Sequence, residues 1–301
     1  RAKAEGFEIA ASREAFFEEC EGKKRAQCVV RSIDSRDVAI TNKEKIAADI
    51  AGCSRGEDDD FVRVRWRGLF PAGGSIQLIG SEDAEAAMAR ETPDASSYAV
   101  TIGVDVARFG DDRTIIWPRR GYDFRSFAPI SLSKEATTVT TENVAKMFND
   151  FVALGCRPQM IFVDEGGVGG GVVDQLRQLG FPVTGVQFGG RPTDSRKYRY
   201  RVDELWCRMR DALPRAALPL AGTLEGDALK EDLTQRQYRF TIKDLISLES
   251  KSDMKERGLR SPDWADALAL NFAGEIAPLE VAGQTYSAQQ LNWDYDPHER
   301  S

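Results

Sequence analysis

The sequence predicts an α/β domain in which a mixed sheet of five or more strands has helices on both faces. Three antiparallel-looking strands come first, at 98–106, 113–117 and 122–130. Helices and strands then alternate, with helices at 141–154, 171–179 and 200–213 and strands at 160–163 and 183–188. A meander followed by this alternation is typical of a mixed sheet covered by helices.

The end of this domain is also patterned. A helix is expected at about 224–235, a hairpin at 238–248 and a closing helix from Pro262 to about Ala273. Ser261 is a suitable N-cap for that last helix, with Pro262 at its first position. Residues 275–301 show no periodicity and are expected to form a polar C-terminal tail.

Residues 1–74 look like the C-terminal part of a domain whose beginning is missing. The expected elements are a helix at 5–19, a strand at 28–31, a helix at 42–51 and, from its strict alternation, a strand at 61–67. This segment is too small and too charged to form a convincing core by itself. Residues 75–97 are expected to be a polar, Ala-rich linker to the domain at 98–274.

Composition excludes several classes of protein. The chain has 301 residues, 42% hydrophobic and 30% charged, with no apolar stretch long enough to span a membrane. Its five cysteines are widely spaced and form no CxxC pair, which argues against a disulfide framework or a zinc site. His298 is the only histidine and lies in the polar tail, so a Ser-His-Asp triad or a histidine-rich metal site is not expected.

Acidic residues occur at unusual positions. Asp105 and Asp164 each end an apolar strand, where an unpaired charge is costly. If those strands are neighbours, their carboxyl ends bring both carboxylates to one edge of the sheet. Asp263 and Asp266 are spaced i, i+3 and share a face at the start of the last helix.

Carboxylate oxygens without histidine or cysteine favour Mg²⁺ or Mn²⁺. Two such ions about 4 Å apart can activate a water and stabilise the leaving oxygen of a phosphodiester. The alternative is that each strand-end aspartate is only a turn or cap residue. The repetition of the feature in one domain favours the metal site.

Two other segments bear on ligands. Residues 191–201 interleave tyrosines with basic side chains, a pattern suited to a nucleic-acid backbone, although a solvated loop would look the same. The basic residues are Arg191, Arg196, Lys197, Arg199 and Arg201. The net charge of −7 argues only weakly against nucleic acid, because phosphate binding depends on the local patch. The glycines at 166–171 follow a strand and open a helix, but they fit no GxGxxG frame, so a dinucleotide site is not expected. They are expected instead to let a DNA backbone or a metal-bound phosphate approach the main chain.

Three segments together resemble the large subunit of tailed-bacteriophage terminases. They are VDVARFGDD at 104–112, VDEGGVGGG at 163–171 and GLRSPDWADAL at 258–268. Residues 28–71, with SIDSRD and DDFVRVRWRGLFP, resemble the stretch between the ATPase core and the nuclease of that family. No GxxxxGK[ST] motif occurs, so ATPase activity is not expected from this chain alone.

The resemblance implies a ribonuclease H-like nuclease that needs two Mg²⁺ or Mn²⁺ ions. Carried over by motif, Asp105, Asp164 and Asp266 are the catalytic metal ligands, and Asp263 is a fourth contributor to the metal site. Around these, the resemblance suggests supporting carboxylates and phosphate-binding lysines. They are Asp112, Glu165, Lys251 and Lys255.

The expected function is metal-dependent endonuclease cleavage of concatemeric double-stranded DNA during viral packaging. The resemblance implies a portal and a small terminase subunit as partners, a homo-oligomer in the motor, and action in the bacterial cytoplasm at the procapsid portal. Two alternatives stay open. One is a non-catalytic DNA-binding or assembly fragment of the motor, and the other is a resolvase or transposase on the same fold.

Overall fold

The structure is a computed structural model, and it describes residues 33–53, 56–69, 77–107, 112–241, 243–275, 280–281 and 284–285. The helix expected at 5–19 and the strand expected at 28–31 lie outside the described residues. The chain divides into two compact units. The first comprises residues 1–76 with 240–246, and the second comprises residues 77–239 with 247–301.

The first unit is helical where it is described. Its elements are α2 (Lys43–Ala51), a 3₁₀ turn η2 (Gly56–Asp58) and α3 (Asp60–Arg65). The strand predicted at 61–67 is wrong. Asp59 caps a helix there by accepting a hydrogen bond from the amide of Phe61 (3.0 Å). Phe61 and Val62 are both buried, whereas a strand would place consecutive side chains on opposite faces.

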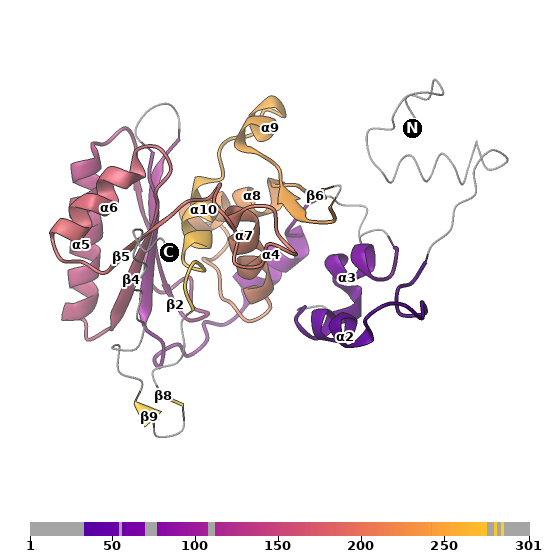
Figure 1. Cartoon of the computed structure of the whole chain (residues 1–301). Helices are drawn as coiled ribbons and strands as arrows, with labels where there is room; N and C mark the ends of the chain where they lie inside the picture. The colour runs from indigo at the N-terminus through magenta and orange to yellow at the C-terminus, as the bar shows by residue number, and fades with distance from the viewer. Residues whose placement is uncertain are drawn as a thin grey trace, which may run out of the picture. The chain divides into compact units, whose positions relative to one another are not determined.

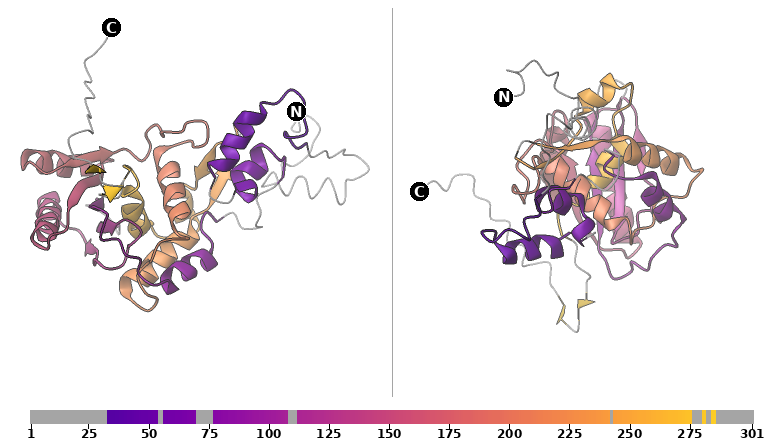
Figure 2. Two further views of the ribbon diagram at one scale, coloured as in Figure 1. Left: turned by 90° about the horizontal axis from the view of Figure 1, so that it is seen from below. Right: turned by 90° about the vertical axis from the view of Figure 1, so that its right-hand side faces the viewer.

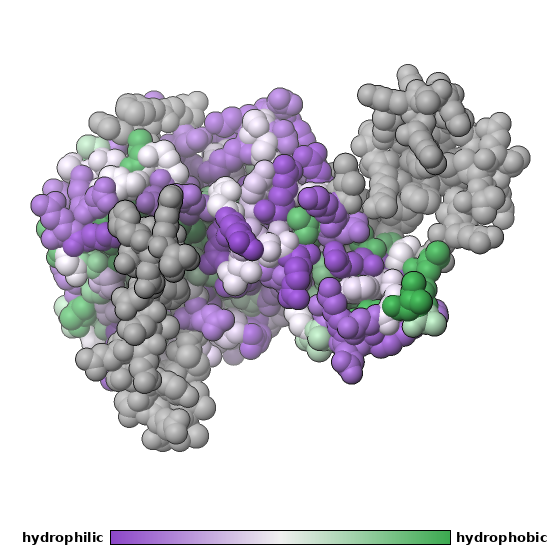
Figure 3. Space-filling view, viewed as in Figure 1, coloured by the Kyte–Doolittle hydropathy of each residue, from purple (hydrophilic) through white to green (hydrophobic). Residues whose placement is uncertain are grey.

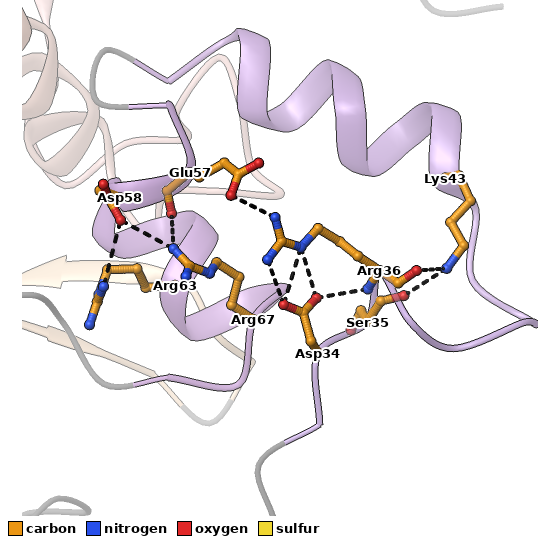
Figure 4. A network of polar contacts seen from close by, with 8 residues as sticks. All are labelled: Asp34, Ser35, Arg36, Lys43, Glu57, Asp58, Arg63 and Arg67. Atoms are coloured by element: carbon orange, nitrogen blue, oxygen red, sulfur yellow. Dashed lines mark hydrogen bonds and ion pairs between the residues drawn. The ribbon is translucent and has the colours of Figure 1, made fainter.

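Ion pairs tie the segments of the first unit together (Figure 4). Arg36 pairs with Asp34 (2.7 Å) and reaches across to Glu57 of η2 (2.6 Å). Arg67 pairs with Asp58 (3.1 Å). These contacts are partly exposed, so each contributes little to stability, and together they mainly hold the segments of this unit beside one another.

The second unit contains a five-stranded mixed sheet in the order β3-β2-β1-β4-β5. Its strands are β1 (Val100–Asp105), β2 (Thr114–Arg120), β3 (Ile130–Leu132), β4 (Pro158–Asp164) and β5 (Val183–Val186). β1 is antiparallel to β2 and parallel to β4. The predicted mixed sheet is confirmed. The strand predicted at 122–130 is wrong, because Gly121 turns the chain with φ +56° and Asp123 accepts from the amides of Arg125 and Ser126.

Helices α5 (Thr137–Ala153) and α6 (Gly169–Gln178) cover one face of this sheet (Figure 1). The core beneath them is apolar, and alternate residues of β1 contribute to it. Those strand residues are Val100, Ile102 and Val104. Because side chains alternate along a strand, the residues between them face the other side of the sheet.

Helix α10 (Asp263–Leu270) packs on that other face, with α7 (Arg201–Ala212) beside it (Figures 1 and 2). Gly103 of β1 lies directly under the helix: a Cβ there would be 2.1 Å from the carbonyl oxygen of Ala267. Asn271, fully buried at the end of α10, accepts from the Thr101 hydroxyl (2.7 Å) and donates to the carbonyl of Trp117 (3.0 Å). These contacts fix how closely and in which register the helix meets the sheet.

Seven further elements complete the described part of the chain, and among them α8 packs against α10 and α4 packs against α8. They are α4 (Ser81–Ala89), α8 (Leu224–Gln235), β6 (Tyr238–Phe240), β7 (Ile246–Leu248), α9 (Lys251–Glu256), β8 (Glu280–Val281) and β9 (Gln284–Thr285). Phe240 of β6 and Ile246 of β7 are counted with the first unit. α4 lies within the stretch expected to be a polar linker. It is ordered because Ala84, Ala87 and Met88 are buried and Glu85 pairs with Lys230 of α8 (2.7 Å).

The start of α10 differs from the prediction. The helix begins at Asp263, its N-cap is Pro262, and Ser261 does not cap it. The cap comes from another helix: the Asp232 carboxylate of α8 accepts from the amides of Trp264 (2.9 Å) and Ala265 (3.2 Å). Such a cap across the fold satisfies the free amides of the first turn as a local one would.

The surface of the second unit shown in Figure 3 is largely hydrophilic, with apolar residues in scattered spots. Among the described residues, no helix is long and apolar enough to cross a membrane.

Gly103→Ala should weaken the contact between β1 and α10. The new methyl group overlaps the Ala267 carbonyl, so we expect the free energy of unfolding to fall by about 3 kcal/mol. Gly171→Ala is the control, because a Cβ at that helical position meets nothing within 4 Å and should stabilise by roughly 0.5 kcal/mol. Urea unfolding measures both, and a Gly103→Ala protein of unchanged stability would contradict the packing.

Asp232→Asn tests the cap through its pH dependence. Burial raises the pKa of Asp232 to about 8. The unfolded chain has an ordinary pKa of about 3.9, so the folded state holds a proton that the unfolded state releases, and stability falls as pH rises toward 8. Asparagine keeps the accepting oxygen without the charge. In EDTA, the free energy of unfolding of the variant relative to that of wild type should therefore rise by more than about 1.4 kcal/mol between pH 5 and 9. Parallel stability curves would contradict this expectation.

Candidate metal centre

The carboxylates of Asp105 and Asp164 lie at the same edge of the sheet. β1 and β4 are parallel neighbours with Val104 opposite Val163, so the two aspartates end adjacent strands in the same direction. Both continue the alternation that faces α10, not the apolar core under α5 and α6. The two strands are therefore neighbours, as the prediction that both carboxylates lie at one edge of the sheet required.

Helix α10 brings two more carboxylates to this edge. Asp266 is completely buried, and Asp263 is 7% exposed. Asp263 Oδ2 accepts from the amide of Arg113 (2.7 Å), which leads into β2. The i, i+3 spacing places both aspartates on the side of the first turn that meets the sheet edge.

Lys251, the first residue of α9, lies between two of these carboxylates. Its Nζ is 2.9 Å from Asp266 Oδ2 and 3.6 Å from Asp105 Oδ2. Burial works to lower the pKa of Lys251, but the two aspartates outweigh it and raise the pKa above its usual value. The ammonium therefore supplies a positive charge at the place where the carboxylates of β1 and α10 meet.

The four aspartates do not share one electrostatic environment. Burial raises the pKa of Asp105 well above its ordinary value, and burial also raises the pKa values of Asp164 and Asp263. Burial opposes ionisation of Asp266 too, yet Lys251 and other cationic contacts hold its pKa below the usual range. The edge thus holds one firmly ionised carboxylate and three whose ionisation would be favoured by an added cation.

No group of three or more His, Cys, Asp or Glu side chains converges on a common point in the described part of the chain. The Lys251 ammonium lies between the carboxylates of Asp105 and Asp266. The donor set itself fits a hard divalent cation, because it offers carboxylate oxygens and no sulfur or imidazole.

Asp164 also has a local role. Its Oδ1 accepts from the amide of Gly166 (3.0 Å), as an aspartate in a turn does. Its backbone is met closely by Gly169 at the start of α6, where a Cβ would lie 1.8 Å from the Asp164 carbonyl oxygen. The glycines after β4 therefore allow the tight turn that holds this carboxylate. Asp164 is thus a turn residue and a candidate metal ligand at the same time.

Of the two predicted supporting carboxylates, one lies near the edge and the other does not. Asp112 lies near the edge, and its carboxylate pairs with Lys255 of α9 (3.7 Å). Glu165 is the next residue after Asp164 and points to the opposite face, where its Oε2 would be 2.7 Å from a Cβ at Gly185. Glu165 is thus separated from the other carboxylates by the sheet.

The basic segment 191–201 does not form a uniform exposed face. Arg201 pairs with Glu204 (2.7 Å) and donates to the carbonyl of Ala273 (2.8 Å), so it is part of the scaffold. Lys197 is only 9% exposed, and Arg196 pairs with Asp194 (3.1 Å). Arg191 and Arg199 are exposed.

Sequence reasoning missed the residues that hold Asp266. Its Oδ1 accepts from Trp206 Nε1 of α7 and from the Arg236 guanidinium just after α8, each at 2.8 Å. Both donors lie far from Asp266 in the sequence and have no motif spacing to it. The one signal in the sequence is the position of Asp266 among apolar residues, because a buried carboxylate needs hydrogen-bond donors.

A scan against models of protein families finds no match for this chain, and a search of curated proteins finds none either. A search of solved structures does find similar folds. The nuclease domain of the large terminase subunit gp2 of bacterial virus Sf6 has a TM-score of 0.53 at 20% sequence identity. The match covers 66% of this chain and 99% of that one.

Two further structures are lysine-to-alanine variants of the same Sf6 subunit. One, with manganese and β-thujaplicinol, has a TM-score of 0.52 at 18% identity, covering 66% of this chain and 99% of that one. The other, with calcium, has the same TM-score and identity and covers 66% of this chain and 100% of that one. The predicted ribonuclease H-like α/β fold is confirmed. This chain has the fold of the nuclease domain of a bacteriophage large terminase subunit.

Proposed function

We propose that this protein is a metal-dependent DNA endonuclease of a viral packaging terminase. The observation that carries the proposal is the carboxylate edge: Asp105 and Asp164 end adjacent parallel strands, and Asp266 meets Asp105 across the ammonium of Lys251. The sequence motifs at these positions and the shared fold support the same function. The manganese-containing Sf6 nuclease structure supports Mg²⁺ or Mn²⁺ as the cofactor.

In this proposal Asp105, Asp164 and Asp266 are the metal ligands, and Asp263 contributes from the first turn of α10. Divalent cations bound there would supply Lewis-acid activation of a water and charge stabilisation at the scissile phosphate. The chain's own contribution is placement. The strand register fixes Asp105 and Asp164, and the contacts of α10 with the sheet fix Asp266.

Lys251 has a separate role in the proposal. In the metal-free protein its ammonium offsets the charge of Asp266 and Asp105. When a cation binds, the same side chain, which is 37% exposed, can turn outward from the carboxylates. A flexible lysine at this edge is suited to meeting a DNA phosphate, as is Lys255 one turn later on α9.

The proposed substrate is concatemeric double-stranded DNA, cut into genome-length units. Among the basic residues of 191–201, exposed Arg191 and Arg199 are the proposed phosphate contacts, while Arg201 serves the scaffold. The proposed partners are a portal and a small terminase subunit, with action at the procapsid in the bacterial cytoplasm. Self-association in the motor belongs to the same proposal.

The domain assignment follows from the same interpretation. Residues 1–74 would be the end of an ATPase domain, 98–274 the nuclease and 275–301 a tail. The helical character of the described first unit and its separation from the second are compatible with this division. ATP hydrolysis is not proposed for this chain alone.

Asp105→Asn should abolish cleavage without unfolding the protein. The amide keeps the shape of the carboxylate but removes an anionic ligand, so we expect nicking of supercoiled plasmid with Mn²⁺ to fall by at least about 100-fold. Circular dichroism and thermal unfolding in EDTA check the fold. Full cleavage by the variant would refute the metal-site assignment.

The wild-type result of the same assay separates the alternatives. DNA binding without cleavage under Mn²⁺ would favour the non-catalytic assembly module, for which the missing convergence of carboxylates is the supporting observation. Cleavage of branched junctions in preference to linear duplex would favour a resolvase-type nuclease.

Lys251→Ala should change how metal affects stability. Without the ammonium, Asp105 and Asp266 lose their shared cation, so the melting temperature in EDTA should fall. Mn²⁺ should then raise it by more than in wild type, because the ion replaces a lost charge without displacing one. Lys255→Ala is the matched control on the same helix, since Lys255 pairs only with partly exposed Asp112 among the contacts described. Equal Mn²⁺ shifts in all three proteins would contradict the placement of Lys251.

A further inference from the structure

The two oxygens of Asp266 have different surroundings. Oδ2 faces Lys251, whose Nζ lies 2.9 Å away at the candidate metal edge. Oδ1 faces into the protein and accepts two hydrogen bonds, from Trp206 Nε1 and from Arg236, each 2.8 Å long. The carboxylate is completely buried, so these contacts are not exchanged for bulk water.

Two donors saturate a carboxylate oxygen. Each oxygen of an ionised carboxylate has two lone pairs in the plane of the group, and Oδ1 of Asp266 uses both. No lone pair of Oδ1 is left for a metal ion. Oδ2 has only the Lys251 ammonium in front of it, which is the position a cation would take.

The two donors are themselves held in place. Trp206 is fully buried on α7, and the guanidinium carbon of Arg236 lies 4.6 Å from the centre of its ring. Arg236, 4% exposed, also directs its Nε toward the carbonyl of Glu249 (3.3 Å). A stacked indole and guanidinium in a buried site have few other rotamers available, so Oδ1 stays capped.

We infer that Trp206 and Arg236 are positioning residues that restrict Asp266 to metal binding through Oδ2 alone. This inference rests on the proposed metal-dependent function. Asp266 would then neither chelate one ion with both oxygens nor bridge two ions through both. Single-oxygen ligation suits Mg²⁺ and Mn²⁺, which prefer compact octahedral shells, and disfavours Ca²⁺, which takes more ligands at longer distances and accepts bidentate carboxylates.

A role limited to stabilising a buried charge would make a different prediction. Removing a donor would then lower stability and would change the affinity for every divalent ion by the same factor. Opening Oδ1 to a metal changes the affinities unequally. The ratio of Mn²⁺ to Ca²⁺ affinity therefore distinguishes the two roles, and it needs no turnover of DNA.

The test compares Trp206→Phe with wild type in direct metal binding. Free Mn²⁺ is followed by electron paramagnetic resonance, and Ca²⁺ affinity is obtained by competition. Phenylalanine keeps most of the apolar volume, changes no charge and removes one of the two donors to Oδ1. We expect Mn²⁺ binding to weaken by about 10-fold and Ca²⁺ binding to weaken less or to strengthen, so that the Mn²⁺ to Ca²⁺ preference falls.

Trp117→Phe is the matched control. Trp117 is also fully buried and packs against α10 through Trp264, with ring centroids 6.0 Å apart. Its Nε1 has no hydrogen-bond partner among the described residues, so the control removes an indole without removing a hydrogen bond to a carboxylate. Its Mn²⁺ to Ca²⁺ preference should equal that of wild type.

A preference that falls in Trp206→Phe but not in Trp117→Phe supports the inference. An unchanged preference in a folded Trp206→Phe protein overturns it and leaves the proposed function standing. If Trp206→Phe does not fold, Arg236→Lys decides by the same criterion, because it keeps the positive charge and removes the planar fork. A wild-type protein that binds neither ion refutes the proposed function and the inference together.

Discussion

The buried carboxylate of Asp266 is the constraint on which the second unit depends. A charge with no exposure to solvent is tolerated only if fixed partners surround it. Those partners come from separate elements: Trp206 from α7, Arg236 from the end of α8 and Lys251 from α9. The positions of these helices around α10 are therefore tied to one side chain, and removing any partner would leave the buried carboxylate with fewer favourable contacts.

The sheet supplies the complementary half of this arrangement. Gly103 lets α10 approach β1 without a side chain between them, and Asn271 fixes the helix end to the strands through Thr101 and Trp117. The same approach that buries the apolar side of α10 brings Asp266 to Asp105. The interface between α10 and the sheet therefore both stabilises the fold and positions the carboxylates of the candidate metal centre. A substitution there would affect stability and the candidate metal centre together, because the distance between helix and sheet is also the distance between carboxylates.

The lysine between the carboxylates shows how such an edge can be stable without a metal ion. Asp105 and Asp266 would repel each other if both were ionised and unpaired. The ammonium of Lys251 reduces that repulsion and belongs to a side chain flexible enough to leave. A site of this kind can fold first and bind its cation afterwards. The absence of a converged set of three carboxylates in the described residues is consistent with that order.

The sequence by itself determined the strands that end in Asp105 and Asp164, the i, i+3 pair on the last helix and the α/β class. These features depend on local periodicity and on the cost of placing a charge at the end of an apolar run, both of which are visible in a linear chain. The strand predicted at 61–67 failed because alternation over seven residues cannot outweigh a local helix cap at Asp59. Only the tertiary structure decided which groups cap α10, hold Asp266 and separate it from Asp105. Those contacts, from Asp232, Arg236 and Lys251, join residues of different elements, and no spacing in the sequence encodes them.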